Sequence, residues 1–352
     1  MVVRRLSGPA RVSRHRVAAT AATAAIALAG ALLLASCSHS SSGSSSATTV
    51  SPTSASVAPL SSTSSTLAPT TSVAATACAR PHAAGRFAQT FDFQGVARSY
   101  QLYVPRGYRG TTAVPVVFDF HGYGSNALQQ LAYSNFAPLA DAHDFLVVAP
   151  QGQGSSPHFN LGQEPGLQND VTMTLALLDH VEATFCVDTR RVYATGMSNG
   201  GAMTSVLACL ASDRFAAFGA VAVELYRAGC GGTRPASIVA FHGTADPVVP
   251  FTGGTVRCCG GAVVGAAPAA MAGWAAHDHC LQAFVDTRLG SEVRRRAWSG
   301  CDGSSSVVFY VIDGGGHTWP GAIPVPRLGL TTSQISATDT IWAFFEAHPL
   351  QI

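Results

Sequence analysis

The sequence carries little net charge and has no cluster of basic residues beyond its first few positions. Its 21 lysine plus arginine residues and 19 aspartate plus glutamate residues give a formal net charge of +2 over 352 residues. The arginines that do cluster lie between Arg4 and Arg16. A nucleic-acid-binding surface needs a larger positive field. We therefore expect neither nucleic acid nor an acidic polymer as a partner.

The chain also lacks the paired cysteine motifs of a structural metal site. None of its nine cysteines forms a C-x-x-C pair with a second such pair or with histidines nearby. We predict no bound metal and no cofactor. With 47% hydrophobic residues, the chain is long enough for one large core or two modest ones, and it contains no internal repeat.

Residues 1–36 predict an export signal of the lipoprotein type. An arginine-rich start precedes an uncharged apolar run over 17–34. The run leads into LASC, which resembles a bacterial lipobox, and its cysteine is Cys37. In a lipobox the cysteine becomes the lipidated first residue and anchors the protein to the membrane. A cleaved secretory signal and an uncleaved anchor remain open as alternatives, because the run is nearly long enough to span a bilayer.

Residues 37–77 predict a flexible linker. This stretch is mostly serine, threonine, alanine and proline with almost no charge. Such a composition cannot bury enough surface to offset its ordering entropy. We expect one catalytic domain at 78–352, held at the extracellular face of the cell membrane or secreted.

The remaining cysteines indicate an oxidising compartment. Setting Cys37 aside leaves eight of the nine, an even number that is typical of disulfide-bonded exported proteins. We expect one disulfide between Cys186 and Cys209 and another between Cys280 and Cys301.

The folded part predicts an α/β protein. From Cys78 onward, short apolar runs rich in β-branched residues alternate with helical patterns, which favours a mostly parallel, doubly wound sheet in a single domain. The alternating segment 99–105 predicts an early antiparallel strand, and helices are expected at 170–185 and 333–348. Further strands are expected at 114–122, 145–152, 191–195, 215–224, 236–243 and 305–313.

The segment YATGMSNGGAMTSVLA places Ser198 between Gly196 and Gly200, at the junction of a predicted strand and a predicted helix. This G-x-S-x-G pattern is typical of a nucleophile elbow, where a sharp turn exposes the serine and small neighbours allow the backbone to pack. In doubly wound sheets, functional groups gather at the carboxyl ends of the strands. Ser198 is therefore the candidate nucleophile.

A nucleophilic serine needs a base, and the base needs an orienting carboxylate. In α/β-hydrolases the chain order is serine, acid, histidine. Asp246 in HGTADPVVP and His317 in VIDGGGHTWPG follow predicted strands in that order. Asp313 is the main rival for the acid, although its place before three glycines favours a role in fixing the loop. Weaker rivals for the two roles are Asp286, Asp302, His242, His277 and His279.

The oxyanion of acyl transfer requires backbone N–H donors aimed at the developing charge. We predict the N–H of Asn199, which follows the nucleophile, and the N–H of Tyr123 in the loop FHGYGSN. A glycine turn that merely ends a strand is the alternative for this loop. Tyr123 and Trp319 are also candidates to line an acyl pocket suited to a flat aromatic acid, and core packing is the equal alternative for Trp319.

The segments FHGYG, DTRRVYATGMSNGGAM, HGTADPVVP and GGGHTWPG together resemble the secreted esterase family that contains poly(3-hydroxybutyrate) depolymerase-like proteins and feruloyl esterases, including lipoproteins of actinobacterial type. The resemblance covers most of the chain after Cys78. It implies the α/β-hydrolase fold, a triad of Ser198, Asp246 and His317, and an oxyanion hole from Tyr123 and Asn199. Depolymerases of solid polyester commonly add a separate polymer-binding domain, and this sequence ends soon after its last predicted helix. Soluble esters are therefore the expected substrates.

We therefore expect an exported serine esterase that acts on small or oligomeric esters. Two other interpretations stay open. One is a serine peptidase on the same fold, although no long insertion is present to build a gating domain. The other is a non-catalytic surface-binding protein.

Overall fold

The computed structural model describes residues 78–162, 164–230 and 234–351. The predicted signal, the linker and Cys37 lie outside the described residues. The described part is built on a ten-stranded sheet with the strand order β1-β2-β4-β3-β5-β6-β7-β12-β11-β10. From β4 to β12 every neighbouring pair is parallel, which confirms the predicted mostly parallel sheet.

The central strands are buried on both faces, as expected for parallel strands covered by helices. All seven residues of β3 are buried, and so are all five residues of β4, β6 and the seven of β7. The sheet strands are β1 (Gly85–Phe93), β2 (Val96–Val104), β3 (Val114–Phe120), β4 (Leu146–Pro150), β5 (Val187–Met197), β6 (Ala217–Val221), β7 (Ser237–Gly243), β10 (Val285–Arg288), β11 (Val293–Trp298) and β12 (Val307–Ile312).

Helices cover both faces of this sheet. One hydrophobic core includes Leu177 of α3, Met203 of α4 and Met271 of α5, and the other includes Ala140 of α2 and Ile341 of α6. The helices are α1 (Ala127–Ser134), α2 (Ala137–His143), α3 (Asp170–Thr184), α4 (Asn199–Leu210), α5 (Ala267–His277) and α6 (Ala337–Glu346). Short elements elsewhere are β8 (Gly254–Thr255), β9 (Val263–Val264) and the 3-10 turns η1 (Cys259–Gly261), η2 (Asp302–Ser304) and η3 (Pro326–Leu328).

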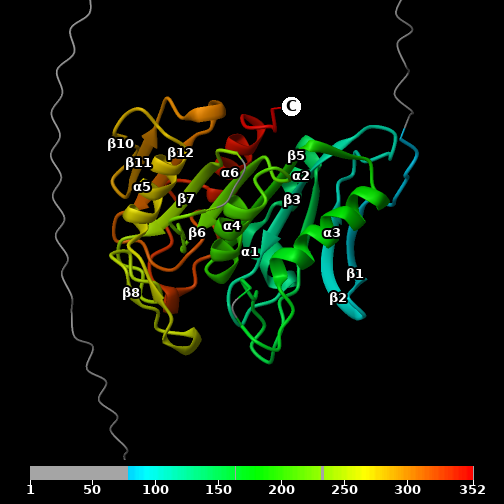
Figure 1. Ribbon diagram of the computed structural model, residues 1–352, viewed down its shortest axis with the longest axis horizontal. Coiled ribbons are helices and arrows are strands. Elements are labelled where there is room, and N and C mark those ends of the chain that lie inside the picture. The colour runs from blue at the N-terminus through cyan, green and yellow to red at the C-terminus, as the bar shows by residue number, and fades with distance from the viewer. Residues whose placement is uncertain (1–77, 163, 231–233, 352) are drawn as a thin grey trace, which may run out of the picture. The chain divides into compact units, whose positions relative to one another are not determined.

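The antiparallel parts of the sheet lie at its two edges. β1 pairs with β2 and β2 pairs with β4 at one edge, while β12, β11 and β10 continue antiparallel at the other. Figure 1 shows β1 and β2 at one end of the sheet and β10 and β11 at the opposite end. The sequence predicted β2 but not β1, β10 or β11. These edge strands are partly exposed and polar, so they lack the apolar runs that identify the central strands.

Asp119 is a buried acid at the second-last position of β3, and it connects this strand to α1. Its two carboxyl oxygens accept hydrogen bonds from Gln130 Nε2 at 2.8 Å and Ser134 Oγ at 2.5 Å. Burial raises the pKa of Asp119 to about 7, although both hydrogen bonds oppose that shift. The acid thus fixes α1 against the sheet, near the carboxyl end of β3.

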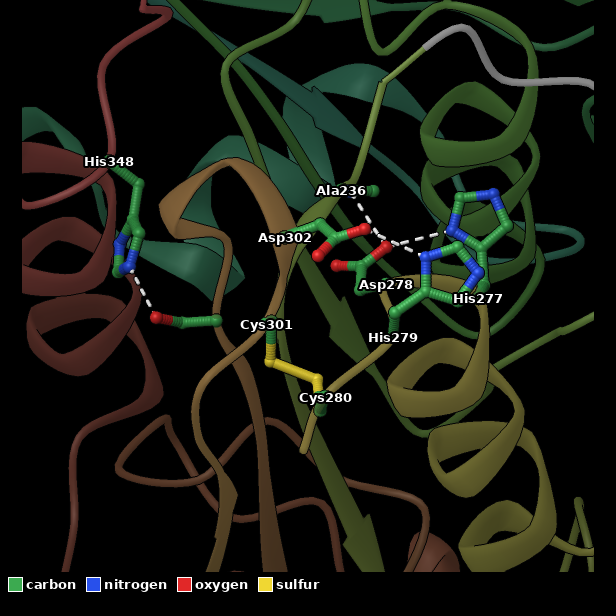
Figure 2. The surroundings of a disulfide bond; sticks show 9 residues. Ala236, His277, Asp278, His279, Cys280, Cys301, Asp302 and His348 are labelled. Atoms are coloured by element: carbon green, nitrogen blue, oxygen red, sulfur yellow. Dashed lines mark hydrogen bonds and ion pairs between the residues drawn. A yellow bond between two sulfur atoms is a disulfide. The ribbon is translucent and has the colours of Figure 1, made fainter. Parts of the chain in front are cut away.

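Four disulfides join the eight cysteines of the described residues. Cys280 pairs with Cys301, as predicted, and Figure 2 shows this bond among buried and ion-paired polar side chains. The predicted Cys186–Cys209 pair is wrong. Cys186 instead joins Cys78, and Cys209 joins Cys230. The Arg80 side chain donates to the Phe185 carbonyl at 2.9 Å, which holds the start of the described chain beside Cys186. The fourth bond joins the adjacent residues Cys258 and Cys259.

Disulfides are typical of oxidising compartments, so these bonds support export of the folded part. Among the described residues, no helix combines the length and the apolar character needed to cross a membrane.

Candidate active site

Ser198 lies on a sharp turn between β5 and α4. Its φ of 58° and ψ of −120° are in a region that non-glycine residues rarely adopt. Such strain costs on the order of 1–3 kcal/mol and persists only where the surroundings impose it. The Ser198 N–H donates to the Val221 carbonyl at 2.8 Å, and its Oγ makes no capping hydrogen bond to α4. The hydroxyl is therefore left available at the carboxyl end of β5.

The glycines beside Ser198 are required by close backbone packing. A Cβ at Gly196 would lie 2.6 Å from the Phe120 carbonyl oxygen, and a Cβ at Gly200 would collide with the same oxygen. A Cβ at Gly122 would lie 3.3 Å from Ser198 Cβ. The loop after β3 thus approaches the serine backbone to backbone, which only glycine allows.

Asp246 and His317 form a buried hydrogen-bonded pair. His317 Nδ1 lies 2.7 Å from Asp246 Oδ2. The other oxygen, Oδ1, accepts the backbone N–H groups of Val248 and Val249 at 2.7 and 2.8 Å. The N–H of His317 donates in turn to the Leu328 carbonyl at 2.7 Å. Both side chains are consequently fixed by their own loops, and His317 Nδ1 is held as the donor to the carboxylate.

Ser198 and His317 line the same cavity, whose volume is about 630 Å³. The structure records no direct hydrogen bond between Ser198 Oγ and the imidazole among the described residues. Nucleophile–base contacts are often looser without substrate and tighten in the complex.

The rival residues lie elsewhere. Asp313 is paired with Arg294 and Arg288, and the hydrogen bond from Arg294 lowers the pKa of its carboxyl. Asp286 pairs with Arg296 on β11. Figure 2 shows three more rivals, His277, His279 and Asp302, around the Cys280–Cys301 disulfide, where His277 contacts Asp278 and His279 contacts Asp302. His242 is buried against Glu224. None of these side chains lines the cavity of Ser198.

The predicted oxyanion donors flank the serine. Asn199 is the first residue of α4, and its side-chain amide bonds the backbone N–H and carbonyl of Phe159 at 2.7 and 3.2 Å. Tyr123 follows Gly122 in the cavity wall. Within the described residues, no hydrogen bond is recorded for the backbone N–H of either Tyr123 or Asn199. Neither N–H is therefore used by another group of the described residues.

His121 anchors the Tyr123 loop, a role that sequence reasoning missed. Its Nε2 accepts the Gly152 N–H at 2.9 Å, so its Nδ1 carries the proton that donates to the Gly122 carbonyl at 2.8 Å. Burial lowers the pKa of His121 to about 4, which keeps the ring neutral and able to make both bonds. The side chain is fully buried.

The cavity walls are mostly apolar and only partly as predicted. Tyr123 lines the cavity and stacks on His158, with ring centroids 4.9 Å apart. Trp319 does not line it. Its side chain is fully buried, packs on Phe136 and donates from Nε1 to Thr338 Oγ1 at 2.9 Å, so we correct it to a core residue. Lining residues that sequence reasoning missed are Gln129, Gln130, Ala132, Tyr133, Met197, Val248, Cys258, Ile323, Val325, Arg327 and Leu328.

No local sequence pattern marks these missed residues as lining a cavity. Residues 323–328 reach the cavity because the Leu328 carbonyl bonds the His317 N–H and the Leu330 carbonyl bonds the Gly316 N–H. Across the described residues, no group of three or more histidine, cysteine, aspartate or glutamate side chains is arranged to hold a metal ion.

The mostly parallel sheet and the serine on its strained turn define this protein as a serine hydrolase of the α/β-hydrolase fold. The prolyl oligopeptidase family model matches residues 130–224, a stretch that includes Ser198 but ends before Asp246 and His317. The solved structure of an acetyl xylan esterase from Aspergillus awamori shares the fold, with a TM-score of 0.54, 15% identity, and coverage of 74% of this chain and 99% of that chain.

Two curated relatives extend over most of the described residues. "Probable feruloyl esterase C" of Aspergillus clavatus is 30% identical over 257 residues, which is 71% of this chain and 84% of the relative. Feruloyl esterase C of Emericella nidulans is 28% identical over 258 residues, with the same two coverages of 71% and 84%. The chain belongs to the feruloyl esterase family, and it is a carboxylic ester hydrolase.

Proposed function

We propose that this protein is an exported serine esterase that hydrolyses feruloyl-type or hydroxyalkanoate-type esters through a triad of Ser198, His317 and Asp246. The observation that carries the proposal is the 2.7 Å hydrogen bond between Asp246 and His317, at the cavity that Ser198 also lines. The names of the curated relatives favour aromatic acyl groups, and the apolar, tyrosine-lined cavity is compatible with a flat ring.

In this mechanism Ser198 Oγ attacks the ester carbonyl while His317 Nε2 takes the hydroxyl proton. Asp246 holds the imidazole in the required tautomer and stabilises its charged form. The Tyr123 and Asn199 N–H groups receive the oxyanion. His317 then protonates the departing alcohol, and water, activated by the same imidazole, releases the acid from the acyl-enzyme.

The location of the enzyme belongs to the same proposal. The disulfides of the described residues support an oxidising compartment, and the sequence predicts lipid attachment at Cys37, the first residue of the predicted linker. We place the catalytic domain outside the cell, tethered by a lipid at Cys37.

The triad is tested by activity-based labelling and substitution. We expect a fluorophosphonate to modify Ser198, and Ser198→Ala to reduce turnover of p-nitrophenyl acetate by roughly 10⁴-fold or more. Asp246→Ala should reduce kcat by roughly 10²- to 10⁴-fold, because the imidazole loses its orienting partner.

Asp313→Ala is the matched control, since Asp313 is a rival carboxylate on the same chain segment as His317 but faces two arginines. It should stay within about threefold of the parent enzyme, as surface ion pairs contribute little. A fully active Ser198→Ala protein would falsify the mechanism. Labelling of Ser198 combined with cleavage of amides but not esters would favour the peptidase interpretation, and absence of labelling would favour a binding protein.

A further inference from the structure

A second acid–imidazole pair lies behind Asp246, and the proposed reaction does not use it. Glu224 follows the carboxyl end of β6, and His242 stands near the carboxyl end of the neighbouring strand β7. Their side chains are almost completely buried, at 0% and 2% exposed. Glu224 Oε2 lies 2.7 Å from His242 Nδ1. On the far side of the ring, His242 Nε2 lies 3.0 Å from the Val249 carbonyl oxygen and 3.5 Å from Asp246 Oδ2.

These contacts determine which protons the pair holds. A carbonyl oxygen can only accept, so His242 Nε2 must carry a hydrogen to bond Val249. A second proton lies between His242 Nδ1 and Glu224 Oε2, and either of these two atoms can carry it. Burial lowers the pKa of His242, but the attraction and hydrogen bond of Glu224 outweigh burial and raise it to about 9. The pair therefore presents an N–H of positive character to Asp246 throughout the neutral pH range.

The pair is poorly suited to a purely stabilising role. Glu224 Oε1 is buried and has no hydrogen-bond partner among the described residues. Burial raises the pKa of this carboxyl, so holding it in its charged form costs free energy. A buried ion pair with an unsatisfied oxygen adds little to stability, because desolvation offsets the attraction.

The position of His242 is better explained by the turn that it faces. The Val249 carbonyl that accepts from His242 belongs to the residue whose N–H donates to Asp246 Oδ1. His242 therefore ties the turn 246–249 to β7. The same ring nitrogen brings positive character to within 3.5 Å of the Asp246 oxygen that bonds His317.

We propose that Glu224 and His242 are a positioning pair for the Asp246–His317 hydrogen bond: they hold the turn that carries Asp246 and favour its carboxylate form. This inference rests on the proposed triad. The ionisable side chains that act on His242 are Glu224 and Asp246, and Asp246 in turn bonds His317. Among the described residues that line the cavity beside His317, Arg327 is the only arginine.

Glu224→Gln is the sharpest test. The amide can donate to Nδ1 and leave the Nε2–H on Val249, while the carboxylate charge disappears. Without the charged pair, the N–H of His242 near Asp246 loses its positive character, so His317 takes up its second proton more easily. We expect the acid limb of the kcat/KM profile for p-nitrophenyl acetate to move to higher pH by roughly 0.5–1 unit, with KM within about twofold.

His242→Gln removes the ring that ties the turn to β7. We expect a shift in the same direction and a kcat on the plateau that is roughly 10- to 100-fold lower, because misplacement of a catalytic group by a fraction of an ångström is costly. His348→Gln is the matched control. His348 also makes two hydrogen bonds, to the Phe344 carbonyl at 2.6 Å and to Ser306 Oγ at 2.9 Å, and Figure 2 shows it near the opposite side of the Cys280–Cys301 disulfide from His277. Its profile should match the parent.

A histidine-selective ¹⁵N NMR titration of the parent protein, with the His242 signal assigned through Glu224→Gln, tests the proposal even where His242→Gln fails to fold. We expect Nε2 of His242 to remain protonated from about pH 5 to about pH 8. An unprotonated Nε2 at neutral pH overturns the proposal. The proposal is also overturned if the Glu224→Gln and His242→Gln proteins have lower thermal midpoints while the acid limbs of their kcat/KM profiles do not move. If Ser198→Ala is inactive in that case, only the pair is refuted and the triad stands.

Discussion

At the residue scale, the site depends on glycines, which have no side chain, as much as on the residues that react. Gly122, Gly196 and Gly200 occupy positions where a Cβ would press on Ser198 or on the Phe120 carbonyl. Their small size brings the loop after β3 against the turn that carries the serine. Tyr123 and Ser198 consequently line the same cavity. An alanine at Gly200 would therefore disturb both Ser198 and the loop after β3 that carries Tyr123.

His121 provides a prediction at this scale. His121→Ala removes the acceptor for Gly152 and the donor for Gly122, so the loop that carries Tyr123 loses its anchor. We expect kcat/KM to fall by roughly 10- to 100-fold, somewhat less than the loss of an oxyanion donor itself. Steady-state kinetics with p-nitrophenyl acetate measure this effect. His180→Ala is the control, since His180 stacks on Phe91 at the edge of the sheet. Equal losses in both variants would contradict the anchoring role.

The same residue makes stability depend on pH. Because burial lowers the pKa of His121 from 6.5 to about 4, the folded state favours the neutral ring. Its contribution to the free energy of unfolding is thus complete above pH 6.5 and is lost as the pH falls through 4. Urea unfolding should accordingly show a smaller difference between the parent and His121→Ala near pH 4 than at neutral pH.

At the scale of elements, the site forms where four strands end. The loops after β3, β5, β7 and β12 carry Tyr123, Ser198, Asp246 and His317 in that order. Parallel strands in one sheet end at the same edge, so residues far apart in sequence meet there. This is why strand patterns and chain order were sufficient to nominate the four residues. The sequence has no comparable pattern for the edge strands or for the residues of the cavity wall, so these could not be predicted.

The cavity wall made by α1 leads to a prediction about substrate choice. Tyr133 faces the cavity, whereas Leu128 on the same helix is 45% exposed and does not line it. If an aromatic acyl group packs on this wall, Tyr133→Ala should lower the ratio of kcat/KM for methyl ferulate to that for p-nitrophenyl acetate by roughly 5- to 20-fold. Leu128→Ala should leave the ratio unchanged. A panel that includes hydroxybutyrate oligomers would show whether an aliphatic acyl group is preferred, and an unchanged ratio in Tyr133→Ala would exclude this wall as an acyl contact.

At the scale of the whole molecule, disulfides hold the start of the described chain to its centre. The Cys78–Cys186 bond closes a separation of 108 residues and joins the residue after the predicted linker to the start of β5. Cross-linking a long segment restricts the unfolded chain and so stabilises the folded one. The bond therefore fixes the first described residue, Cys78, beside the start of β5.

The lipid anchor is the prediction that belongs to this scale. In cells that process lipoproteins, Cys37→Ser should move the enzyme from the membrane fraction to the soluble or extracellular fraction, because no acylated cysteine remains. Phase separation in detergent, followed by immunoblotting and radiolabelled palmitate, measures the change. Activity per molecule should be unaffected, as the catalytic domain begins after the linker. If both proteins partition into the soluble fraction, the signal is simply cleaved, and if both stay in the membrane fraction, the apolar run is an uncleaved anchor.

The sequence by itself determined the fold class and the order of the chemistry, because buried parallel strands have a distinct apolar pattern and the G-x-S-x-G turn admits few residues. The tertiary structure decided which groups meet. It set Asp246 rather than Asp313 against His317, buried Trp319 in the core and paired Cys186 with Cys78. It also placed Glu224 and His242 behind Asp246. Each of these outcomes depends on distances between residues that are remote in the chain, and local sequence patterns carry no information about such distances.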